Sequence, residues 1–481
     1  MKAYLQAAID LMKRTGASYA DCRFVATEDE SISVRNKVVD SISRSTTKGV
    51  GIRAIVDGAW GFAASNILTE DEVNRVALRA IDVAKASALT KMEDVVLSKE
   101  EPHKDKYSST WKEDPFKVPM DDKVNVLIRC SEGLMTKPEI KVAEAYMQFW
   151  RTDKIFLSTE GHDIEQTVVE SGAGIQATAV RDGEMQRRSY PNSFRGDFAT
   201  RGYESVREMK LESNLDWVRD EAIMLLNADE CPAGKRDIII ASNQLALQVH
   251  ESLGHPAELD RAFGTEISLA GGSFLRPELL GTGYRYGSKL CNIVADSTVP
   301  GGLGTFGYDD EGVKACRSYC IKDGIFVGYL MSRETAAKLG LKSNACMRAH
   351  GWWSIPLIRM VNVNLEPDKG TLEDLVGDTK DGLLFDTNKS WSIDDKRLNF
   401  QFATELVWEI KNGKRVKPYK NGLYTGITPE FWGSLVAVGG PAEWHVWGIP
   451  NCGKGEPMQS AHVAHGTSPA KFTKINVGVA Q

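Results

Sequence analysis

The spacing of hydrophobic residues predicts three helices in the first third of the chain. Apolar side chains recur every three to four positions in residues 4–15, 69–84 and 121–135, which is the spacing of amphipathic helices that pack on a core. Thr69 precedes the second of these and stands three residues before Glu72. This pair is typical of a capping box at a helix N-terminus.

Strand patterns lie between these helices. Two apolar runs, residues 49–56 and 59–64, flank Asp57-Gly58, a dipeptide that favours the type I′ turn of a hairpin. A sequence similar to residues 49–56 recurs at residues 172–180, again just before an Asp-Gly pair, Asp182-Gly183. The repetition suggests a weak internal duplication.

The C-terminal half is predicted to be rich in strands. Residues 400–410 alternate between apolar and polar side chains, as expected of a strand with one buried face. Asn412-Gly413 and Asn421-Gly422 are predicted to form further hairpin turns.

A chain of 481 residues is too long for one hydrophobic core. We predict an α+β protein with an N-terminal region of helices and antiparallel strands, residues 1–229. Residues 98–119 within it are polar and contain prolines, so they are a candidate loop or linker. Residues 230–481 are predicted to form a β-rich domain that carries the chemically interesting helix.

The composition is that of an ordinary soluble protein, with 42% hydrophobic and 26% charged residues. The net charge of −6 argues against nucleic acid as a direct partner. The first residues predict an amphipathic helix rather than a signal peptide, and no apolar run approaches membrane-spanning length. Eight scattered cysteines fit a reducing compartment. We therefore expect a cytoplasmic protein without membrane association.

The candidate chemistry lies in residues 236–261, where a short apolar strand leads into a helix with Ser242 as its expected N-cap. His250, Glu251 and His255 stand near the end of that helix. Two imidazoles can hold a metal ion, and a carboxylate beside them can take a proton from metal-bound water. The pattern indicates a hydrolytic metal centre.

The spacing of this motif is unusual, because its histidines are five residues apart rather than the four of HExxH. On a continuous α-helix the two side chains would point ~140° apart. Gly254 and Pro256 suggest a solution. We expect the helix to stop near Leu253, so that His255 returns to the metal from an extended segment.

The residues alone leave the third metal ligand open. A catalytic zinc takes three protein ligands and keeps one position for water. The candidates are two acidic residues just after the motif, a cysteine in a glycine-rich segment near the C-terminus, and two late histidines at HxxH spacing: Glu258, Asp260, Cys452, His462 and His465.

Two further features are interpreted as structural. The acidic triplet Asp309-Asp310-Glu311 precedes Gly312 and is expected to form a solvated turn, with binding of Ca²⁺ or a substrate amine as alternatives. The pair Trp352-Trp353 is expected to serve packing.

The motif HESLGHPAELD (residues 250–260) resembles the HExxxHxxExD motif of the TldD/PmbA family, the metalloproteases also called modulators of DNA gyrase. Further segments are similar to blocks of the same family and extend the likeness over nearly the whole chain. These segments are residues 49–66, 295–313, 321–340, 356–367 and 451–459.

The resemblance implies a zinc peptidase of the catalytic TldD type, because the paralogous TldE/PmbA subunit lacks the motif kept here. It also implies that Cys452 is the third zinc ligand beside His250 and His255. Family members form dimers that enclose a chamber for unfolded peptides, so we expect a homodimer or a heterodimer with a TldE/PmbA-like paralogue. The sequence departs from the family pattern around His462 and at Ser252 and Pro256.

The expected function is hydrolysis of peptide bonds in unfolded polypeptides or small peptides, with Glu251 as general base. Two alternatives remain. The chain could be a non-catalytic or assembly subunit whose zinc is structural, with His462 or His465 completing a closed site. It could also be a metal-dependent hydrolase of a non-peptide amide.

Overall fold

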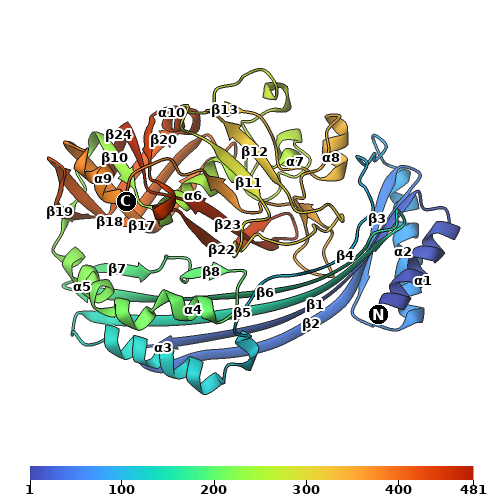
Figure 1. The fold of residues 1–481 in the computed structure, drawn as a ribbon, viewed down its shortest axis with the longest axis horizontal. Coiled ribbons are helices and arrows are strands. Elements are labelled where there is room, and N and C mark those ends of the chain that lie inside the picture. Colours follow the sequence, from blue (N-terminus) through green and yellow to red (C-terminus); the bar gives the residue numbers. More distant parts are fainter. Residues whose placement is uncertain (480–481) are drawn as a thin grey trace.

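The computed structural model describes residues 1–479 and confirms the α+β class. A long, curved N-terminal sheet lies along one side of the molecule, and a more irregular β-rich body formed by the C-terminal half lies against it (Figure 1). No helix among the described residues is long and apolar enough to cross a membrane.

The N-terminal sheet has eight strands, in the order β3-β2-β1-β5-β6-β4, with β7 and β8 both paired to β6. Its four central strands are unusually long. The strands are β1 (Tyr19–Arg35), β2 (Val38–Val56), β3 (Ala59–Ser65), β4 (Lys104–Ser108), β5 (Ile140–Ser158), β6 (Asp163–Arg181), β7 (Glu184–Tyr190) and β8 (Asp197–Ala199).

Helices cover the two ends of this sheet and form a separate small core at each end. One core combines α1 and α2 with β1 and β2, and the other combines α3 and α5 with β1, β5 and β6. The predicted helices are confirmed, with shifts of one or a few residues at their ends. They are α1 (Lys2–Arg14), α2 (Glu70–Ala88) and α3 (Met120–Leu134), and the further helices of this half are α4 (Glu204–Met209) and α5 (Leu215–Leu226).

The suggested internal duplication has a structural counterpart. Each half of the sheet follows the order helix, long strand, long strand, short strand, helix, with β8 and α4 inserted before α5. The two halves meet where β1 and β5 pair antiparallel. The predicted hairpin turns match as well, since Asp57 and Asp182 both have positive φ, 49° and 52°, and each is followed by glycine with positive φ.

Residues 98–119, expected as a loop or linker, contain β4, which pairs parallel with β6.

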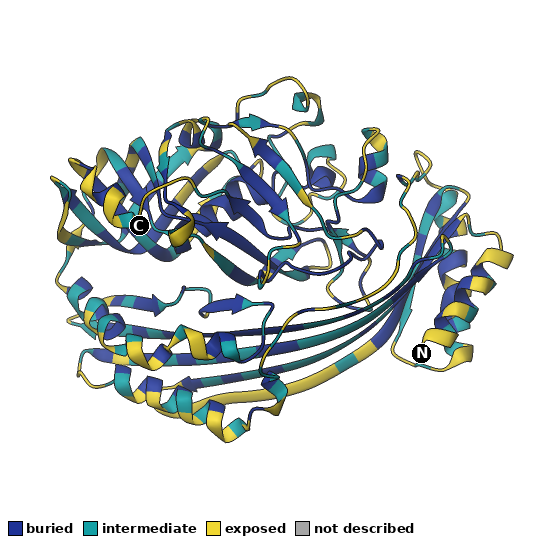
Figure 2. Ribbon diagram, viewed as in Figure 1, coloured by how far each residue is buried: buried dark blue, intermediate teal, exposed yellow. Residues whose placement is uncertain are grey.

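The first half of β2 is more exposed than the second half. Residues 38–47 of this strand pair with β1 alone and are mostly exposed, as the yellow stretch in Figure 2 shows. This stretch is an open edge of the sheet.

The C-terminal half contains the largest hydrophobic core. An eight-stranded sheet, in the order β17-β10-β24-β20-β18-β19-β9 with β21 on β24, packs near a four-stranded sheet and the hairpin β22–β23. Its strands are β9 (Asp229–Glu230), β10 (Gly234–Ile240), β17 (Asp381–Ile393), β18 (Asn399–Lys411), β19 (Lys414–Lys420), β20 (Gly422–Ile427), β21 (Leu435–Val438), β22 (His445–Lys454), β23 (Gln459–Thr467) and β24 (Ala470–Val479).

The smaller elements connect these sheets. The four-stranded sheet has the order β13-β12-β11-β16. The remaining elements are α6 (Ser242–Val249), α7 (Leu259–Phe263), β11 (Ile293–Asp296), β12 (Arg317–Lys322), β13 (Ile325–Phe326), α8 (Arg333–Lys338), β14 (Met347–Arg348), β15 (Leu357–Ile358), β16 (Val363–Leu365), α9 (Leu372–Gly377) and α10 (Thr428–Gly433).

One of the two predicted C-terminal turns is wrong. Asn412-Gly413 joins β18 to β19 as a hairpin, as expected. Asn421-Gly422 does not reverse the chain, because β19 and β20 both pair with β18, one after the other along the same side. Asn421 has φ 54°, so this Asn-Gly pair forms a local irregularity between two collinear strands.

Candidate metal centre

The strand and helix that carry the motif are buried against the C-terminal sheet. β10 pairs with β17 on one side and with β24 on the other, which explains its run of isoleucines. Ser242 is the first residue of α6 and not its N-cap. Its hydroxyl donates to the Thr467 carbonyl at 2.7 Å and accepts from the Trp447 indole at 2.8 Å, so it ties the helix to β22 and β23.

The two histidines come together through a π-helical turn. The α-helix ends at Val249, and His250–Gly254 form a π-helix. The N–H of His255 donates to the His250 carbonyl at 3.2 Å, a bond between residues five apart. Because one π turn spans five residues, it places the two rings together, with centroids 4.9 Å apart.

The expected break of the helix is therefore wrong. His255 keeps helical dihedrals, φ −66° and ψ −46°, despite the proline that follows it. Gly254 serves close packing instead of ending the helix, since a Cβ there would lie 2.0 Å from the Met360 sulfur. Tertiary contacts at this site override the local preference of the residue before proline.

The structure brings His250, His255 and Cys452 into one group. One potential ligand atom from each lies within 4.8 Å of the others, and the distance from His255 Nε2 to Cys452 Sγ is 3.7 Å. All three are at least 95% buried. Cys452 comes from β22, so the group joins the motif to a segment about 200 residues later.

His465 lies behind His250 and fixes its tautomer. The Nδ1 of His465 is 2.8 Å from the Val363 carbonyl, which can only accept, so this nitrogen carries the proton. Its Nε2 must then accept from His250 Nδ1 at 2.8 Å. The Nε2 of His250 is left with a free lone pair, the form that binds a metal.

Glu258 plays the same part for His255. Its Oε2 lies 3.2 Å from His255 Nδ1 and also accepts from Arg261 Nε at 2.7 Å. Burial alone would raise the pKa of Glu258, but Lys454 and Arg261 hold it well below its usual value. The anionic carboxylate accepts a hydrogen bond from the Nδ1–H group of His255. The Nε2 lone pair of His255 is then free to bind a metal.

Asp260, the other acidic candidate for a metal ligand, is paired with a lysine. Asp260 receives two bonds from Lys454 Nζ, at 2.7 and 2.8 Å. Lys454 also lies 3.4 Å from Glu258 and stands two residues after Cys452. The acidic residues of the motif thus anchor the segment that carries the cysteine and lie outside the ligand group.

The protonation states suit a metal. Burial lowers the pKa of His250 to about 4 and also lowers that of His255, so both imidazoles are neutral at pH 7. Burial opposes ionisation of Cys452, but His255 and Arg359 outweigh it and lower the pKa of the thiol. Two neutral imidazoles and a thiolate form a donor set that fits zinc.

Glu251 is held by two residues that the sequence did not indicate. Its Oε1 accepts from Trp391 Nε1 at 2.9 Å, and its Oε2 accepts from Arg397 Nη1. The second nitrogen of Arg397 donates to the Ala270 carbonyl at 3.0 Å. Trp391 lies near the end of β17 and Arg397 lies in the connection to β18, and no local pattern relates either residue to the motif.

Two expectations concern residues that lie away from this group. His462 pairs with Glu170 of the N-terminal sheet, at 2.8 Å, and lines a separate cavity. The triplet Asp309-Asp310-Glu311 is not a solvated turn, because all three residues are buried. Asp310 contacts Lys154, and Glu311 lies 3.7 Å from Arg53, so N-terminal cations compensate their charge.

Comparison with known families decides the relationship. A family model described as the PmbA/TldA metallopeptidase C-terminal domain matches residues 233–478, just over half of the chain, and one described as domain 1 matches residues 20–84. The chain belongs to the TldD/PmbA family of metallopeptidases. The resemblance drawn from the motif is thereby confirmed.

Several family relatives match this chain over most of its length. It is 28% identical to a metalloprotease of Methanocaldococcus jannaschii, over 91% of this chain and 92% of the relative. It is 25% identical to a metalloprotease TldD homologue of Haemophilus influenzae, covering 98% and 94%. A zinc metalloprotease TldD homologue of Saccharolobus solfataricus is 23% identical, covering 96% and 97%.

Solved structures show the same fold. A Thermotoga maritima protein described as a modulator of DNA gyrase superposes with a TM-score of 0.79 at 18% identity, covering 99% of both chains. TldE from Thermococcus kodakarensis superposes with a TM-score of 0.73 at 16% identity, covering 99% of this chain and 100% of its own. The TldD/PmbA fold therefore extends over the whole chain.

Proposed function

We propose that this protein is a zinc-dependent peptidase that hydrolyses peptide bonds of unfolded polypeptides or small peptides. The observation that carries the proposal is the meeting of His250, His255 and Cys452, with one potential ligand atom from each inside 4.8 Å. Three protein ligands of this kind are typical of a catalytic zinc with one position open. Relatives named metalloproteases support the same reaction class.

When bound there, zinc would acidify a water molecule and polarise the scissile carbonyl. Glu251 takes the proton of the attacking water on its carboxylate and later delivers it to the leaving amine. Arg397 and Trp391 each hold one carboxylate oxygen, so they restrict the rotation of the side chain. His465 and Glu258 keep the imidazole protons on the Nδ1 atoms, away from the ion.

The alternative of a closed structural site has less support. Such a site needs a fourth protein ligand. The ring nitrogens of His465 are occupied by Val363 and His250, and Nδ1 of His462 is paired with Glu170. Neither histidine belongs to the ligand group.

We further propose that the chain works as a dimer in the cytoplasm, with itself or with a TldE/PmbA-like paralogue. The likeness to TldE supports a partner of this kind. The open edge of β2 also favours association, because Val38, Val39 and Ile42 are exposed there beside unpaired backbone groups. The eight cysteines are all free, which fits a reducing compartment.

The decisive experiment is Glu251→Gln, assayed on an unfolded polypeptide and on small amides, with and without a chelator. We expect hydrolysis of the polypeptide to be at least about 100-fold slower in the variant than in the wild type, which is the lower end of the usual range for loss of a general acid–base. Zinc content, measured by mass spectrometry, should stay at the wild-type level. The control is Glu373→Gln, which changes an exposed glutamate of α9. Undiminished peptidase activity in Glu251→Gln would refute the proposal.

A further inference from the structure

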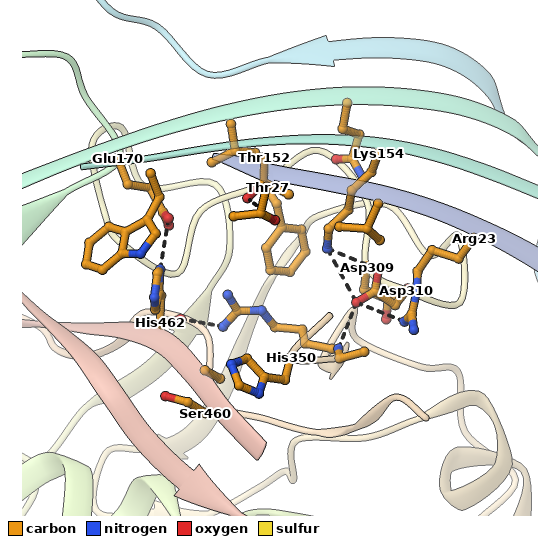
Figure 3. A pocket seen from close by; sticks show the side chains of 18 of the residues that line it. Arg23, Thr27, Thr152, Lys154, Glu170, Asp309, Asp310, His350, Ser460 and His462 are labelled. Atoms are coloured by element: carbon orange, nitrogen blue, oxygen red, sulfur yellow. Dashed lines mark hydrogen bonds and ion pairs between the residues drawn. The ribbon is translucent and has the colours of Figure 1, made fainter. Parts of the chain in front are cut away.

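A polar cavity lies between the N-terminal sheet and the C-terminal body, apart from the metal ligands. Its volume is about 280 Å³. One wall consists of side chains from β1, β5 and β6, and the other consists of residues 303–310, residues 348–353 and the hairpin strand β23 (Figure 3). None of the metal-centre residues lines it. The volume is close to the lower bound of roughly 300 Å³ for small-molecule pockets, so a ligand must be small.

The sheet wall of the cavity has a charge gradient along the strand direction. Side chains two residues apart share a face of a strand, and the registers of β1, β5 and β6 align them in rows across the sheet. The two rows at one end carry Arg23 and Lys154, the next row is neutral and the row at the other end is acidic. In this order the residues are Arg23 and Lys154, then Thr27, Thr152 and Val168, then Asp29 and Glu170.

Two cations and two aspartates, Asp309 and Asp310, lie at the cationic end, and burial together with the charge of Glu311 raises the pKa of Asp309 well above its usual value, which favours its neutral form. Arg23 and Lys154 share one carboxylate, that of Asp310, at 3.4 Å from Arg23 Nη1 and 3.1 Å from Lys154 Nζ. Arg23 is 97% buried, and its Nε has no hydrogen-bond partner. That nitrogen is covered by protein atoms, so Lys154, whose side chain is 27% exposed, is the donor that a ligand carboxylate meets, and Arg23 adds positive charge behind it. This end is suited to bind a carboxylate.

The opposite end carries acidic groups. Glu170 accepts from His462 at 2.8 Å, and Asp29 accepts from the Gln148 amide at 2.8 Å. Each carboxylate keeps further acceptor capacity beyond this one bond. Figure 3 shows Glu170 and His462 at one side, Lys154 and Arg23 at the other, and the two threonines between them.

The distance between the ends sets the length of the ligand. Lys154 and the Trp150 row, which contains Asp29 and Glu170, are four residues apart on β5, or about 13 Å at a strand rise of ~3.3 Å. The charged side chains take up part of that distance. An extended peptide spans ~3.3–3.6 Å per residue, so about three residues bridge the remainder.

We propose that this cavity binds a short zwitterionic peptide of about three residues. Its α-carboxylate lies at Arg23 and Lys154, and its α-ammonium lies at Asp29 and Glu170. A free amino acid is too short to reach both ends, and a polyanion is repelled by the two carboxylates. The site goes beyond the proposed hydrolysis, because binding here does not depend on the metal centre.

The test is isothermal titration calorimetry with triglycine on the zinc-loaded Glu251→Gln protein, which prevents turnover. The comparison ligands are N-acetyl-triglycine, triglycine amide and glycine. Loss of a hydrogen bond to a charged group weakens binding by about tenfold or more. We therefore expect triglycine to bind at least about tenfold more tightly than each of the three comparison ligands. Equal affinities for all four ligands, or no binding of triglycine, overturn the proposal without any further mutation.

Two added substitutions locate the ends of the ligand. Lys154→Met should remove the preference for the free carboxylate, and Glu170→Gln should remove the preference for the free ammonium. The control is Lys141→Met, an exposed lysine on the same strand as Lys154, which should leave all affinities unchanged. Triglycine binding that ignores Lys154 and Glu170 but disappears in Cys452→Ser would place the peptide at the metal centre and overturn the proposal. Thermal unfolding of each variant verifies its fold.

Discussion

His465 Nε2 lies 2.8 Å from Nδ1 of His250, a residue 215 positions earlier in the chain. The bond has a defined direction, because the Val363 carbonyl fixes the proton of His465 on its other nitrogen. A residue that sequence reasoning offered as a possible ligand thus orients a ligand. It determines which nitrogen of His250 faces a metal.

The first prediction concerns this bond. His465→Leu removes the acceptor at similar volume, so His250 loses its preferred tautomer and ring orientation. We expect zinc affinity to fall about 10- to 100-fold, the usual effect of losing such an outer partner. Competition against a chelating dye measures it. His462→Leu, in the same HxxH pair but bonded to Glu170, should leave zinc affinity unchanged. Equal affinities in the two variants would contradict the assignment.

The second prediction concerns the sulfur ligand. Cys452→Ser should lose the thiolate-to-metal charge-transfer absorption of the cobalt-substituted protein, because a hydroxyl is a poor substitute for a thiolate. Cys316→Ser, a change at a partly buried cysteine outside the ligand group, should keep it. An unchanged cobalt spectrum in Cys452→Ser would exclude this sulfur from the metal.

The third prediction tests the packing behind the π turn. In Gly254→Ala the new methyl group would lie 2.0 Å from the sulfur of Met360, which is buried. Overpacking of this kind costs about 1–3 kcal/mol of unfolding free energy. Urea denaturation measures the change. Gly433→Ala is the matched control, since a Cβ there meets nothing within 4 Å, and it should not destabilise the protein. A stability loss shared by both variants would rule out contact with Met360 as its cause.

Local patterns predicted the local structure well. Asp57-Gly58 and Asp182-Gly183 specify their turns because both residues of each pair adopt positive φ, a conformation that few other residues tolerate. The same signal failed at Asn421-Gly422. There the positive φ of Asn421 lies between two strands that continue along the same side of β18. A turn and a continuing strand therefore have the same local signal, and only the strand with which the following residues pair distinguishes them.

The metal centre was predictable in its residue types but not in its geometry. The five-residue spacing of His250 and His255 ruled out a regular α-helix. A break in the helix and a π turn would each bring the two imidazoles together, and the spacing does not distinguish between them. Packing of Gly254 against Met360 accompanies the second solution, and that contact joins residues more than 100 positions apart. Trp391 and Arg397 reach Glu251 over a similar separation, so no sequence window could reveal them.

The fourth prediction concerns acid stability. Burial lowers the pKa of His162 to about 4, and its Nδ1 accepts the His103 N–H at 3.1 Å. Below its unfolded pKa of about 6.5, the unfolded chain binds a proton that the native state rejects until about pH 4. The unfolding free energy should therefore fall by about 2 kcal/mol through this group between pH 7 and pH 5.

Denaturation at several pH values checks this effect. His162→Gln should remove the contribution of His162 to the loss of unfolding free energy at acidic pH. The unfolding free energy should then depend less steeply on pH. His445→Gln is a control of opposite sign, because Asp197 outweighs burial and raises the pKa of His445. Its stabilisation is present at acidic pH and disappears as the pH rises through the folded-state pKa. Parallel profiles of wild type and His162→Gln would show that His162 titrates normally.

The last prediction separates the orientation of Glu251 from metal binding. Trp391 is 45% exposed and donates one indole hydrogen bond to Oε1 of Glu251. Trp391→Phe keeps the aromatic ring and removes this donor, at a cost of about 1 kcal/mol, so kcat/KM should fall about fivefold. Zinc content should not change, because Trp391 does not belong to the ligand group. Trp217→Phe is the matched control, since it removes an indole bond of 2.7 Å to Asn214 in the N-terminal half. If Trp391→Phe lost zinc together with activity, the indole would support the metal site as a whole and not the carboxylate alone.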